Sequence, residues 1–471
     1  MSRPLQLHHD RLFSADLNQR ACARELYQTV KNLPIISPHG HTDPQWFADN
    51  APFSNPTDLL IRPDHYVVRM LYSLGVPIQA FGLDRLDGQG DKVDPAAIWR
   101  TFAKYYYAFR GTPSRMWLDY VFKEVFHLDV ALDETTADHY YQHINDCLQQ
   151  AQFLPRALFE QFNIEVITTT ESPLDTLKHH QTILDSGWQG KVVTAYRSDP
   201  VVDPDYEKFS DNLNQLAELT GEDTRNYRGY LNALKIRRDF FKSMGATSTD
   251  HGHPTAFTAD LSKAEATALF DRVKMGNASM VDAELFRGQM LMEMALMSLD
   301  DGLVMQIHPG AIRNHNPWLF SHYGRDKGAD IPSTTNYVND LKPLLDKVGN
   351  EIGLTIILFT LDETTYSREL APLAGHYPVL KLGPPWWFHD SPEGMRRFRQ
   401  QTTETAGFYN TVGFNDDTRA FLSIPARHDV ARRMDCAFLA ELVADHRLHI
   451  DEAQEIAHDL AYNLAKKAYK L

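Results

Sequence analysis

The sequence predicts an α/β protein, a distorted (β/α)8 TIM-type barrel with a helical insertion after the first strand and a helical C-terminal tail. Two observations support this prediction. Eight short, apolar runs recur along the chain, and helical patterns separate most of them. Most of the runs are nearly continuous in apolar residues, as expected for parallel strands buried on both faces. Because the fourth run is weaker than the others, a doubly wound open sheet is the alternative architecture.

The predicted strands are limited by turn residues at their ends. They cover residues 33–39, 162–170, 191–197, 246–251, 302–308, 353–361, 378–383 and 410–414. Helical patterns, in which apolar residues recur every three or four positions, cover residues 203–219, 226–244, 282–299 and 335–350. This repeated succession of strand and helix is typical of a (β/α)8 barrel.

The connection between the first two predicted strands is too long for an ordinary barrel loop. Residues 45–160 contain several aromatic, helix-like segments, including IWRTFAKYYYAF from Ile98 and SRMWLDYVFKEVF from Ser114. We therefore expect a helical insertion there and further helices from Arg427 onward. Since no internal repeat, low-complexity tract or flexible linker divides the chain, residues 1–471 are expected to form one domain.

The charge balance limits the classes of partner. The chain has 471 residues, 43% of them hydrophobic, with 47 Lys and Arg against 62 Asp and Glu, a net charge of −15. Such a surface repels nucleic acid and anionic membranes, although one Arg in a pocket can still bind a small anion. The scattered cysteines, the lack of a signal-peptide pattern and the lack of a membrane-spanning stretch favour a cytoplasmic enzyme. The sequence is compatible with a homo-oligomer.

Barrel enzymes place catalytic groups where strands run into the following loops, so polar residues at strand ends are the first candidates. His39 and His41 close the first strand two residues apart, so both imidazoles can bind one divalent metal. Asp417 follows the eighth strand, which lies beside the first in a closed barrel. Its carboxylate would complete a zinc-like site or act as a general base. Taken alone, a His-x-His pattern is more often two packed histidines.

Two other strand ends carry histidines, and the run after the eighth strand carries an arginine. His308 follows the fifth strand and His251 closes the fourth, while His253 is expected to be a solvated or capping residue. Arg419 is expected either to pair with Asp417 or to face an anionic ligand.

Aromatic and basic residues complete the candidate set. Trp386 and Trp387 follow the seventh strand and are expected to form a hydrophobic lid or core contact, although Trp faces also stack on sugar rings. The run RPDHYVVRM places His65 and Tyr66 on consecutive residues, as a proton donor and acceptor, although a solvated helix start gives the same pattern. Arg197 closes the third strand.

Several of these stretches together resemble the uronate isomerase family, a divergent branch of the amidohydrolase-type barrels. The matching runs span most of the chain in order: PHGHTDP, DHYVVRM, TTESPLDTL, YRSDP, STDHG, QIHPGAIRNHN, PPWWFHDSPEGM and NDDTRAFLSIPARHDVARR. The resemblance implies a distorted (β/α)8 barrel with an added helical region. It also implies interconversion of D-glucuronate with D-fructuronate and of D-galacturonate with D-tagaturonate.

The resemblance also assigns residues. The family's metal-site residues match His39, His41 and Asp417. Residues placed around the substrate in the family match His65, Tyr66, His308 and Arg419, and further substrate contacts match Arg197, Trp386 and Trp387. The implied cofactor is a divalent metal, with zinc the first candidate, and the resemblance leaves open whether catalysis needs it.

An aldose-ketose isomerase, which is an intramolecular oxidoreductase, moves one proton from C2 to C1 and others between O2 and O1 through an enediol. We expect the base to be Asp417 or Tyr66. Arg419 and His65 would stabilise the charge of the enediolate, and Arg197 would hold the uronate carboxylate.

Two rival functions stay open. One is a zinc-dependent hydrolase of the same superfamily, which would need further ligands from His251 or His308 to activate a water. The strand ending in FTLDE offers no histidine ligand, which weakens that interpretation. The other rival is a non-catalytic barrel that binds sugar acids.

Overall fold

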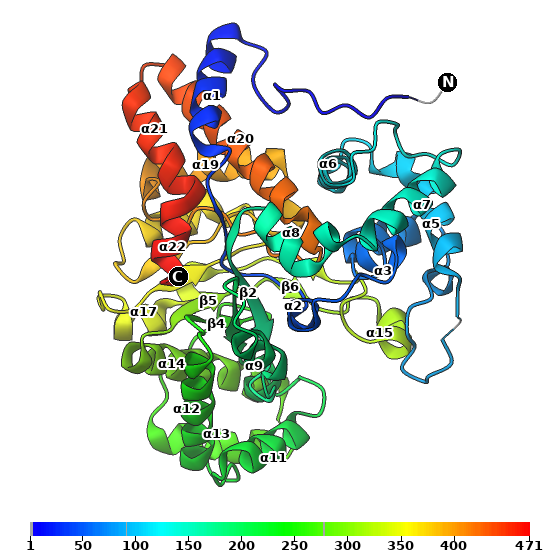
Figure 1. Ribbon diagram of the computed structural model, residues 1–471. Coiled ribbons are helices and arrows are strands. Elements are labelled where there is room, and N and C mark those ends of the chain that lie inside the picture. The colour runs from blue at the N-terminus through cyan, green and yellow to red at the C-terminus, as the bar shows by residue number, and fades with distance from the viewer. Residues whose placement is uncertain (1–2, 91, 277) are drawn as a thin grey trace.

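The computed structural model describes residues 3–90, 92–276 and 278–471 and contains a curled parallel sheet with helices around it (Figure 1). The order of its seven strands, β1-β2-β3-β4-β5-β8-β9, follows the chain, as in a barrel. The strands are β1 Ile35–Ser37, β2 Ile164–Glu171, β3 Lys191–Arg197, β4 Ser248–His251, β5 Val304–Ile307, β8 Ile356–Leu358 and β9 Leu380–Leu382. The predicted α/β barrel is confirmed, and the open-sheet alternative is wrong.

The eighth predicted strand is less regular than expected. Within residues 410–414, Thr411 pairs with Leu382 in an isolated parallel bridge, so this segment is not one of the seven ladder strands. Gly413 has φ +76°, and a Cβ there would stand 2.7 Å from the carbonyl oxygen of Leu460. The C-terminal helices therefore pack where a regular strand would continue, and only glycine fits the bend without strain.

The barrel closes between its first and last segments through the backbone. The N–H of His41 donates to the carbonyl oxygen of Thr418 at 3.0 Å. On the other side, the Thr170 hydroxyl at the end of β2 donates to the carbonyl oxygen of Gly40 at 2.8 Å. These bonds fix the His39-Gly40-His41 segment between its two neighbours.

Helices fill the segment between β1 and β2, which confirms the predicted helical insertion. They are α2 Pro44–Asp49, α3 Pro56–Leu60, α4 His65–Ser73, α5 Pro95–Tyr105, α6 Pro113–Tyr120, α7 Ala137–Leu148 and α8 Pro155–Gln161. Proline begins most of them, where its missing N–H breaks no helical hydrogen bond. Their buried aromatic residues, such as Trp99 and Phe102, share one apolar core with Ile35 of β1 and Ile164 of β2. This core attaches the insertion to the barrel.

Further helices surround the rest of the sheet. They are α9 Lys178–Asp185, α10 Asp199–Val202, α11 Phe209–Thr220, α12 Tyr227–Ser243, α13 Lys263–Val273, α14 Met280–Asp301, α15 Pro317–Tyr323, α16 Tyr337–Asp340, α17 Lys342–Val348, α18 Ala371–Ala374 and α19 Pro392–Ala406. The single helix predicted over residues 335–350 is wrong. It divides into α16 and α17 because Pro343, in the first turn of α17, has no N–H to continue the preceding turn.

The predicted C-terminal tail is helical, as expected, and packs beside the N-terminal helix (Figure 1). The four helices of this region are α1 Leu17–Val30, α20 Ile424–Ala444, α21 Ile450–His458 and α22 Leu464–Tyr469. Short 3₁₀ and π turns complete the chain: η1 Ile78–Phe81, η2 Tyr106–Phe109, η3 Val121–Val125, η4 Ala151–Phe153, η5 Tyr366–Leu370, η6 Trp387–His389, η7 Phe421–Ser423 and η8 Asp459–Asn463.

One small element has no counterpart in the prediction. Strands β6 Ala311–Ile312 and β7 Ile331–Pro332 pair antiparallel between β5 and α16, and the chain between them carries α15.

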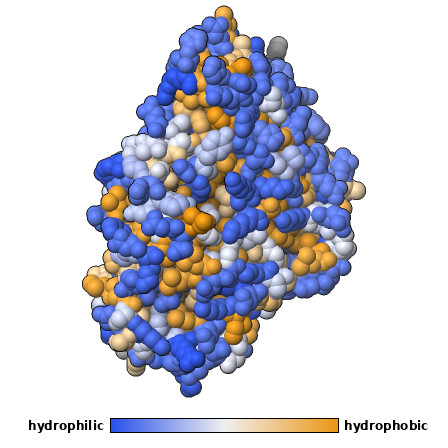
Figure 2. Space-filling view, turned by 90° about the vertical axis from the view of Figure 1, so that its left-hand side faces the viewer, coloured by the Kyte–Doolittle hydropathy of each residue, from blue (hydrophilic) through white to orange (hydrophobic). Residues whose placement is uncertain are grey.

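Hydrophilic residues predominate on the face shown in Figure 2, with apolar residues interspersed. Of the helices in the described ranges, none has the length and apolar character needed to cross a membrane.

Candidate active site

A cavity of about 880 Å³ is lined by most of the side chains that the sequence singled out for the site, although His251 and His253 are not among them. Its wall includes residues from the ends of the barrel strands, from the start of α4 and from the β6–β7 region. The predicted residues that line it are His39, His41, His65, Tyr66, Arg197, His308, Trp386, Trp387, Asp417 and Arg419. The barrel therefore brings together side chains that are far apart in the sequence.

His39, His41 and Asp417 form a compact group where the first and last barrel segments meet. The Oδ1 atom of Asp417 lies 3.2 Å from Nε2 of His41 and 3.5 Å from Nε2 of His39. Burial alone would raise the pKa of Asp417, but the two imidazoles outweigh burial and hold this pKa well below its ordinary value. Asp417 is therefore an ionised carboxylate at neutral pH.

This group fits a divalent metal. Two imidazole nitrogens and one carboxylate oxygen are a zinc-type donor set, and ligands about 2.0–2.2 Å from a tetrahedral ion stand about 3.3–3.6 Å apart. The two nitrogen–oxygen distances of 3.2 and 3.5 Å agree with that spacing. Asp417 reaches this position with φ +39°, a left-handed conformation uncommon for aspartate. Burial lowers the pKa of His41, which keeps its imidazole neutral and able to bind a metal.

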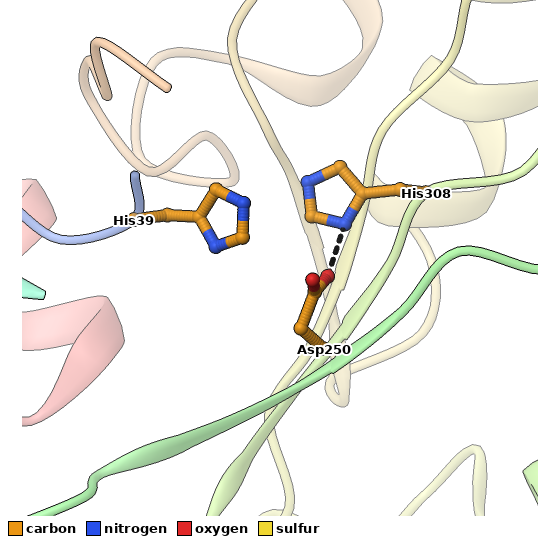
Figure 3. A group of neighbouring side chains, drawn as sticks. All are labelled: His39, Asp250 and His308. Carbon is orange, nitrogen blue, oxygen red and sulfur yellow. Dashed lines mark ion pairs between the residues drawn. The ribbon is translucent and has the colours of Figure 1, made fainter. Parts of the chain in front are cut away.

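Asp250 is a central residue that the sequence reasoning missed. Its Oδ1 atom lies 2.7 Å from Nδ1 of His308, and its Oδ2 atom accepts a hydrogen bond from Nη1 of Arg197 at 2.9 Å. Figure 3 shows the rings of His39 and His308 facing each other, with Asp250 beside His308. The rings stack at 4.8 Å, and His39, Asp250 and His308 form a second group that could hold a metal.

Strand alternation could have identified Asp250. In the parallel sheet Asp250 is in register with Arg197 of β3 and with Gln306 of β5, so these three positions share one face. His308, two residues after Gln306, continues that face. His251, which the sequence reasoning considered because of its residue type, has the opposite parity.

The two histidines of the TDHGH run, His251 and His253, are buried away from the cavity wall. His251 hydrogen-bonds to the hydroxyls of Ser198 at 2.9 Å and Thr249 at 3.1 Å. The expectation of a solvated or capping His253 is wrong, because its side chain is 2% exposed and lies 4.0 Å from Asp199. Thus neither histidine lines the cavity, and Asp250 beside them does not line it either but contacts His308 and Arg197, which do.

The start of α4 presents two side chains to the cavity. Asp64 caps this helix by accepting from the backbone N–H groups of Tyr66 at 2.8 Å and Val67 at 3.4 Å. Burial lowers the pKa of His65 to about 3, with help from Arg419, so its imidazole is neutral. Burial also raises the pKa of Tyr66 well above its ordinary value, so its phenol keeps its proton. The rings of His65 and Tyr66 stack at 4.7 Å.

Arg419 neither pairs with Asp417 nor lies free. Its Nη2 atom donates to Oδ2 of Asp326 at 3.0 Å, and both residues line the cavity. Burial would raise the pKa of Asp326, but Arg419 and Arg197 outweigh it and lower this pKa to about 2. Asp326 lies between α15 and β7, in a connection that the sequence reasoning did not consider. This carboxylate holds the guanidinium at the cavity wall.

The two tryptophans after β9 have different environments. Trp386 is buried, donates from Nε1 to the carbonyl oxygen of Thr360 at 3.1 Å, and packs edge-on against His308. Trp387 has φ +52° and packs edge-on against His65. The Cζ atom of Arg313 lies 5.1 Å from its ring centroid. Trp386 therefore supports the barrel end, and Trp387 forms part of the wall nearer to α4.

Glu171 lies beside the cavity-lining residues Thr170 and Ser172. Its pKa shift predicts how the stability of the protein depends on pH. Burial raises the pKa of Glu171 to about 7, although the hydroxyls of Thr169 and Thr194 donate to its carboxylate. In the unfolded chain this proton is lost near pH 4.5. The unfolded state is therefore favoured increasingly as the pH rises from about 4.5 to 7, and the effect is constant above that.

We expect Glu171→Gln to remove this pH dependence. Relative to the wild type, the variant should gain up to about 3 kcal/mol between pH 4.5 and 7.5, measured by urea unfolding. Glu165→Gln on the same strand is the control. Burial would raise the pKa of Glu165, but Lys466 and Tyr462 outweigh it and lower this pKa, so the stability difference for Glu165→Gln should stay nearly constant from pH 4.5 to 7.5 and change only below that range. A difference independent of pH for Glu171→Gln would contradict the prediction.

Comparison with known proteins supports one family. The family model described as glucuronate isomerase matches residues 11–469. A uronate isomerase of Xanthomonas axonopodis pv. citri is 67% identical over 470 residues, which is 100% of both chains.

Solved structures agree with this match. The crystal structure of a glucuronate isomerase from Caulobacter crescentus has a TM-score of 0.98 and 61% identity, covering 99% of this chain and 98% of that one. The crystal structure of a uronate isomerase from Thermotoga maritima has a TM-score of 0.91 and 26% identity, covering 98% and 99%. Sequence and fold therefore point to the same relatives over the full length of the chain.

Proposed function

The chain belongs to the glucuronate isomerase family, and on that premise we propose that it interconverts D-glucuronate with D-fructuronate and D-galacturonate with D-tagaturonate through an enediol. It is then an intramolecular oxidoreductase of hexuronic acids. The observation that supports this most strongly is one cavity in which an ionised carboxylate, a neutral phenol and a neutral imidazole face the same space. Such a set can remove a carbon-bound proton and supply protons to oxygen.

Asp417 is the better candidate for the base, and Tyr66 for the proton donor. At neutral pH Asp417 is ionised, because the nearby imidazoles lower its pKa, and Tyr66 is protonated, because burial raises its pKa. His39 and His41 both approach Asp417 most closely at its Oδ1 atom. The other carboxylate oxygen, Oδ2, is then left to accept the C2 proton. Asp417 would return that proton to C1 while Tyr66 moves a proton at O1 or O2.

The remaining cavity residues would bind and stabilise the charged substrate. Arg419 and the neutral imidazole of His65 would donate hydrogen bonds to the enediolate oxygen. His308, Trp386 and Trp387 would shape the wall around the sugar carbons. This arrangement gives each predicted residue a role that matches its ionisation and position.

His39, His41 and Asp417 would hold the divalent metal, for which we propose zinc. When bound, this ion would polarise a substrate oxygen and place the sugar beside Asp417. The residues that move protons are the same with or without this contribution. We also infer a cytoplasmic location, which is consistent with three cysteines that form no disulfide.

The test is to incubate the purified protein with glucuronate and galacturonate in deuterated water, with and without a chelator. We expect the corresponding ketoses, with deuterium at C1 in part of the product. Zinc-dependent hydrolysis of amides or esters without any isomerisation would favour the hydrolase instead. Tight uronate binding with no ketose and no exchange at C2 would favour a binding protein.

Arg197 is proposed to bind the uronate carboxylate, and Gly252 provides a way to test this. The Nε and Nη1 atoms of Arg197 donate to Asp199 and Asp250, both at 2.9 Å, which fixes the guanidinium plane. A Cβ on Gly252 would stand 2.5 Å from the remaining nitrogen, Nη2, and 2.8 Å from Oδ2 of Asp199. An alanine at residue 252 must therefore displace the guanidinium.

We expect Gly252→Ala to raise KM for both uronates by about 10-fold or more, with a smaller change in kcat, because a charged hydrogen bond to substrate is weakened. Steady-state kinetics on the two substrates measures this. Gly353→Ala is the control, since no atom lies within 4 Å of the added carbon there. An unchanged KM would exclude Arg197 as the carboxylate-binding residue.

A further inference from the structure

Arg427 is a buried arginine that contacts several separate parts of the cavity wall. It lies in the first turn of α20, lines the cavity and is 2% exposed. Its Nη1 atom donates to Oδ2 of Asp390 and, at 3.4 Å, to the carbonyl oxygen of Asp416. Its Cζ atom stands 3.6 Å from the ring centroid of Trp117 and 5.7 Å from that of Tyr66. One guanidinium thus joins α20, the loop after β9, the last barrel segment, α6 and α4.

This ion pair costs free energy to bury. Removing a guanidinium and a carboxylate from water costs several kcal/mol per ion, and apolar residues of similar volume often give equal stability. Burial raises the pKa of Asp390 to about 7 even though Arg427 lowers it. Among the described residues, Oδ1 of Asp390 has no hydrogen-bond partner. Stability alone therefore does not account for this charged pair at the cavity wall.

The surroundings of Tyr66 give the pair a role. The charged groups with the largest influence on this residue are the carboxylates of Asp64, Asp390 and Asp417 and the guanidinium of Arg427, and Arg69 on the same helix is a further cation near it. Trp117 packs edge-on against the Tyr66 ring at 5.9 Å and is itself covered by the guanidinium. Arg427 therefore contacts the ring that supports Tyr66 and is the cation with the largest influence on Tyr66 among three nearby carboxylates.

We propose that Arg427, held by Asp390 and stacked on Trp117, is a positioning residue that fixes Tyr66 for proton transfer. Arg427 acts through Tyr66, so this inference rests on the proposed function of that residue. Loss of the guanidinium would let α4 move relative to the barrel and would leave Asp64 and Asp390 without the cation that lowers their pKa values.

The test compares two buried arginine–aspartate pairs. We expect Arg427→Gln to lower kcat by about 30-fold or more while KM changes little, and Arg427→Lys to recover part of the loss. Arg399→Gln is the matched control. Arg399 is also buried, pairs with Asp435 at 2.7 and 3.2 Å, and does not line the active-site cavity. It should retain most of the activity.

A double-mutant cycle separates positioning from general damage. If Arg427 acts through Tyr66, the double variant Tyr66→Phe with Arg427→Gln should be no slower than Tyr66→Phe alone. Guanidinium ions at millimolar concentration should partly restore the kcat of Arg427→Ala and should leave the kcat of Arg399→Ala unchanged. Asp390→Asn keeps the side-chain shape and should give the same kcat defect, which provides a readout if Arg427→Gln does not fold.

The inference is overturned if Arg427→Gln is no slower than Arg399→Gln, or if the effects of Arg427→Gln and Tyr66→Phe multiply. Both results require a wild-type enzyme that isomerises uronates. If the wild type forms no ketose, the proposed function itself fails, and that outcome is visible before any variant is made.

Discussion

Asp417→Asn is expected to lower kcat for both uronates by about 1,000-fold or more, because the amide can neither accept the C2 proton nor complete a charged metal site. The side chain keeps its shape, so the fold should persist. The rate of ketose formation and the exchange of the C2 proton in deuterated water should fall together, since both depend on the same base.

Asp416→Asn is the control for this variant. Asp416 is also buried and adjacent in sequence, but its Oδ2 atom pairs with Nε2 of His428 at 3.0 Å, and it does not line the cavity. Its loss of activity should be much smaller. If Asp417→Asn kept a tenth of the activity or more, Asp417 would not be the base, and Tyr66 would become the next candidate.

Tyr66→Phe is expected to lower kcat by about 100-fold, equivalent to about 2.7 kcal/mol in the activation barrier, with KM nearly unchanged. Only the hydroxyl is removed, so the stacking with His65 and the packing on Trp117 remain. The proton that moves at the substrate oxygen would then have to come from water or from a less well placed group.

Tyr469→Phe is a matched control for the loss of a buried hydroxyl. Tyr469 is fully buried, its hydroxyl has no hydrogen-bond partner among the described residues, and it does not line the cavity. It should be as active as the wild type. If Tyr66→Phe instead raised KM and left kcat unchanged, Tyr66 would bind substrate without transferring a proton.

The seven ladder strands were predictable because a strand buried on both faces must be apolar, and short apolar runs with turn residues at their ends are visible in a sequence. The irregular eighth segment was not, because its conformation depends on Gly413 meeting the backbone of Leu460, which is distant in sequence. Similarly, the antiparallel pair of β6 and β7 has only two residues in each strand, too few to form a pattern.

The candidate site was predictable where residue type and strand end coincide, as for His39, His41 and His308. Asp250 was missed because a histidine stands beside it, and only the register between strands shows which of the two shares a sheet face with Arg197 and Gln306. Asp326 and Arg427 were missed for another reason. Asp326 contacts Arg419, and Arg427 contacts Tyr66. Each contact joins segments far apart in the chain, and no local sequence pattern predicts such contacts.

The closure of the barrel by His41 and Thr418 has a consequence for the order of events during synthesis. The residues that would hold the metal come from near the beginning of the chain and from near residue 417, so the site forms only when these distant segments meet. Such long-range contacts are slow to form. A growing polypeptide that has folded its insertion and first strands would still lack the metal site, and both metal uptake and turnover would begin only after nearly the whole chain has left the ribosome.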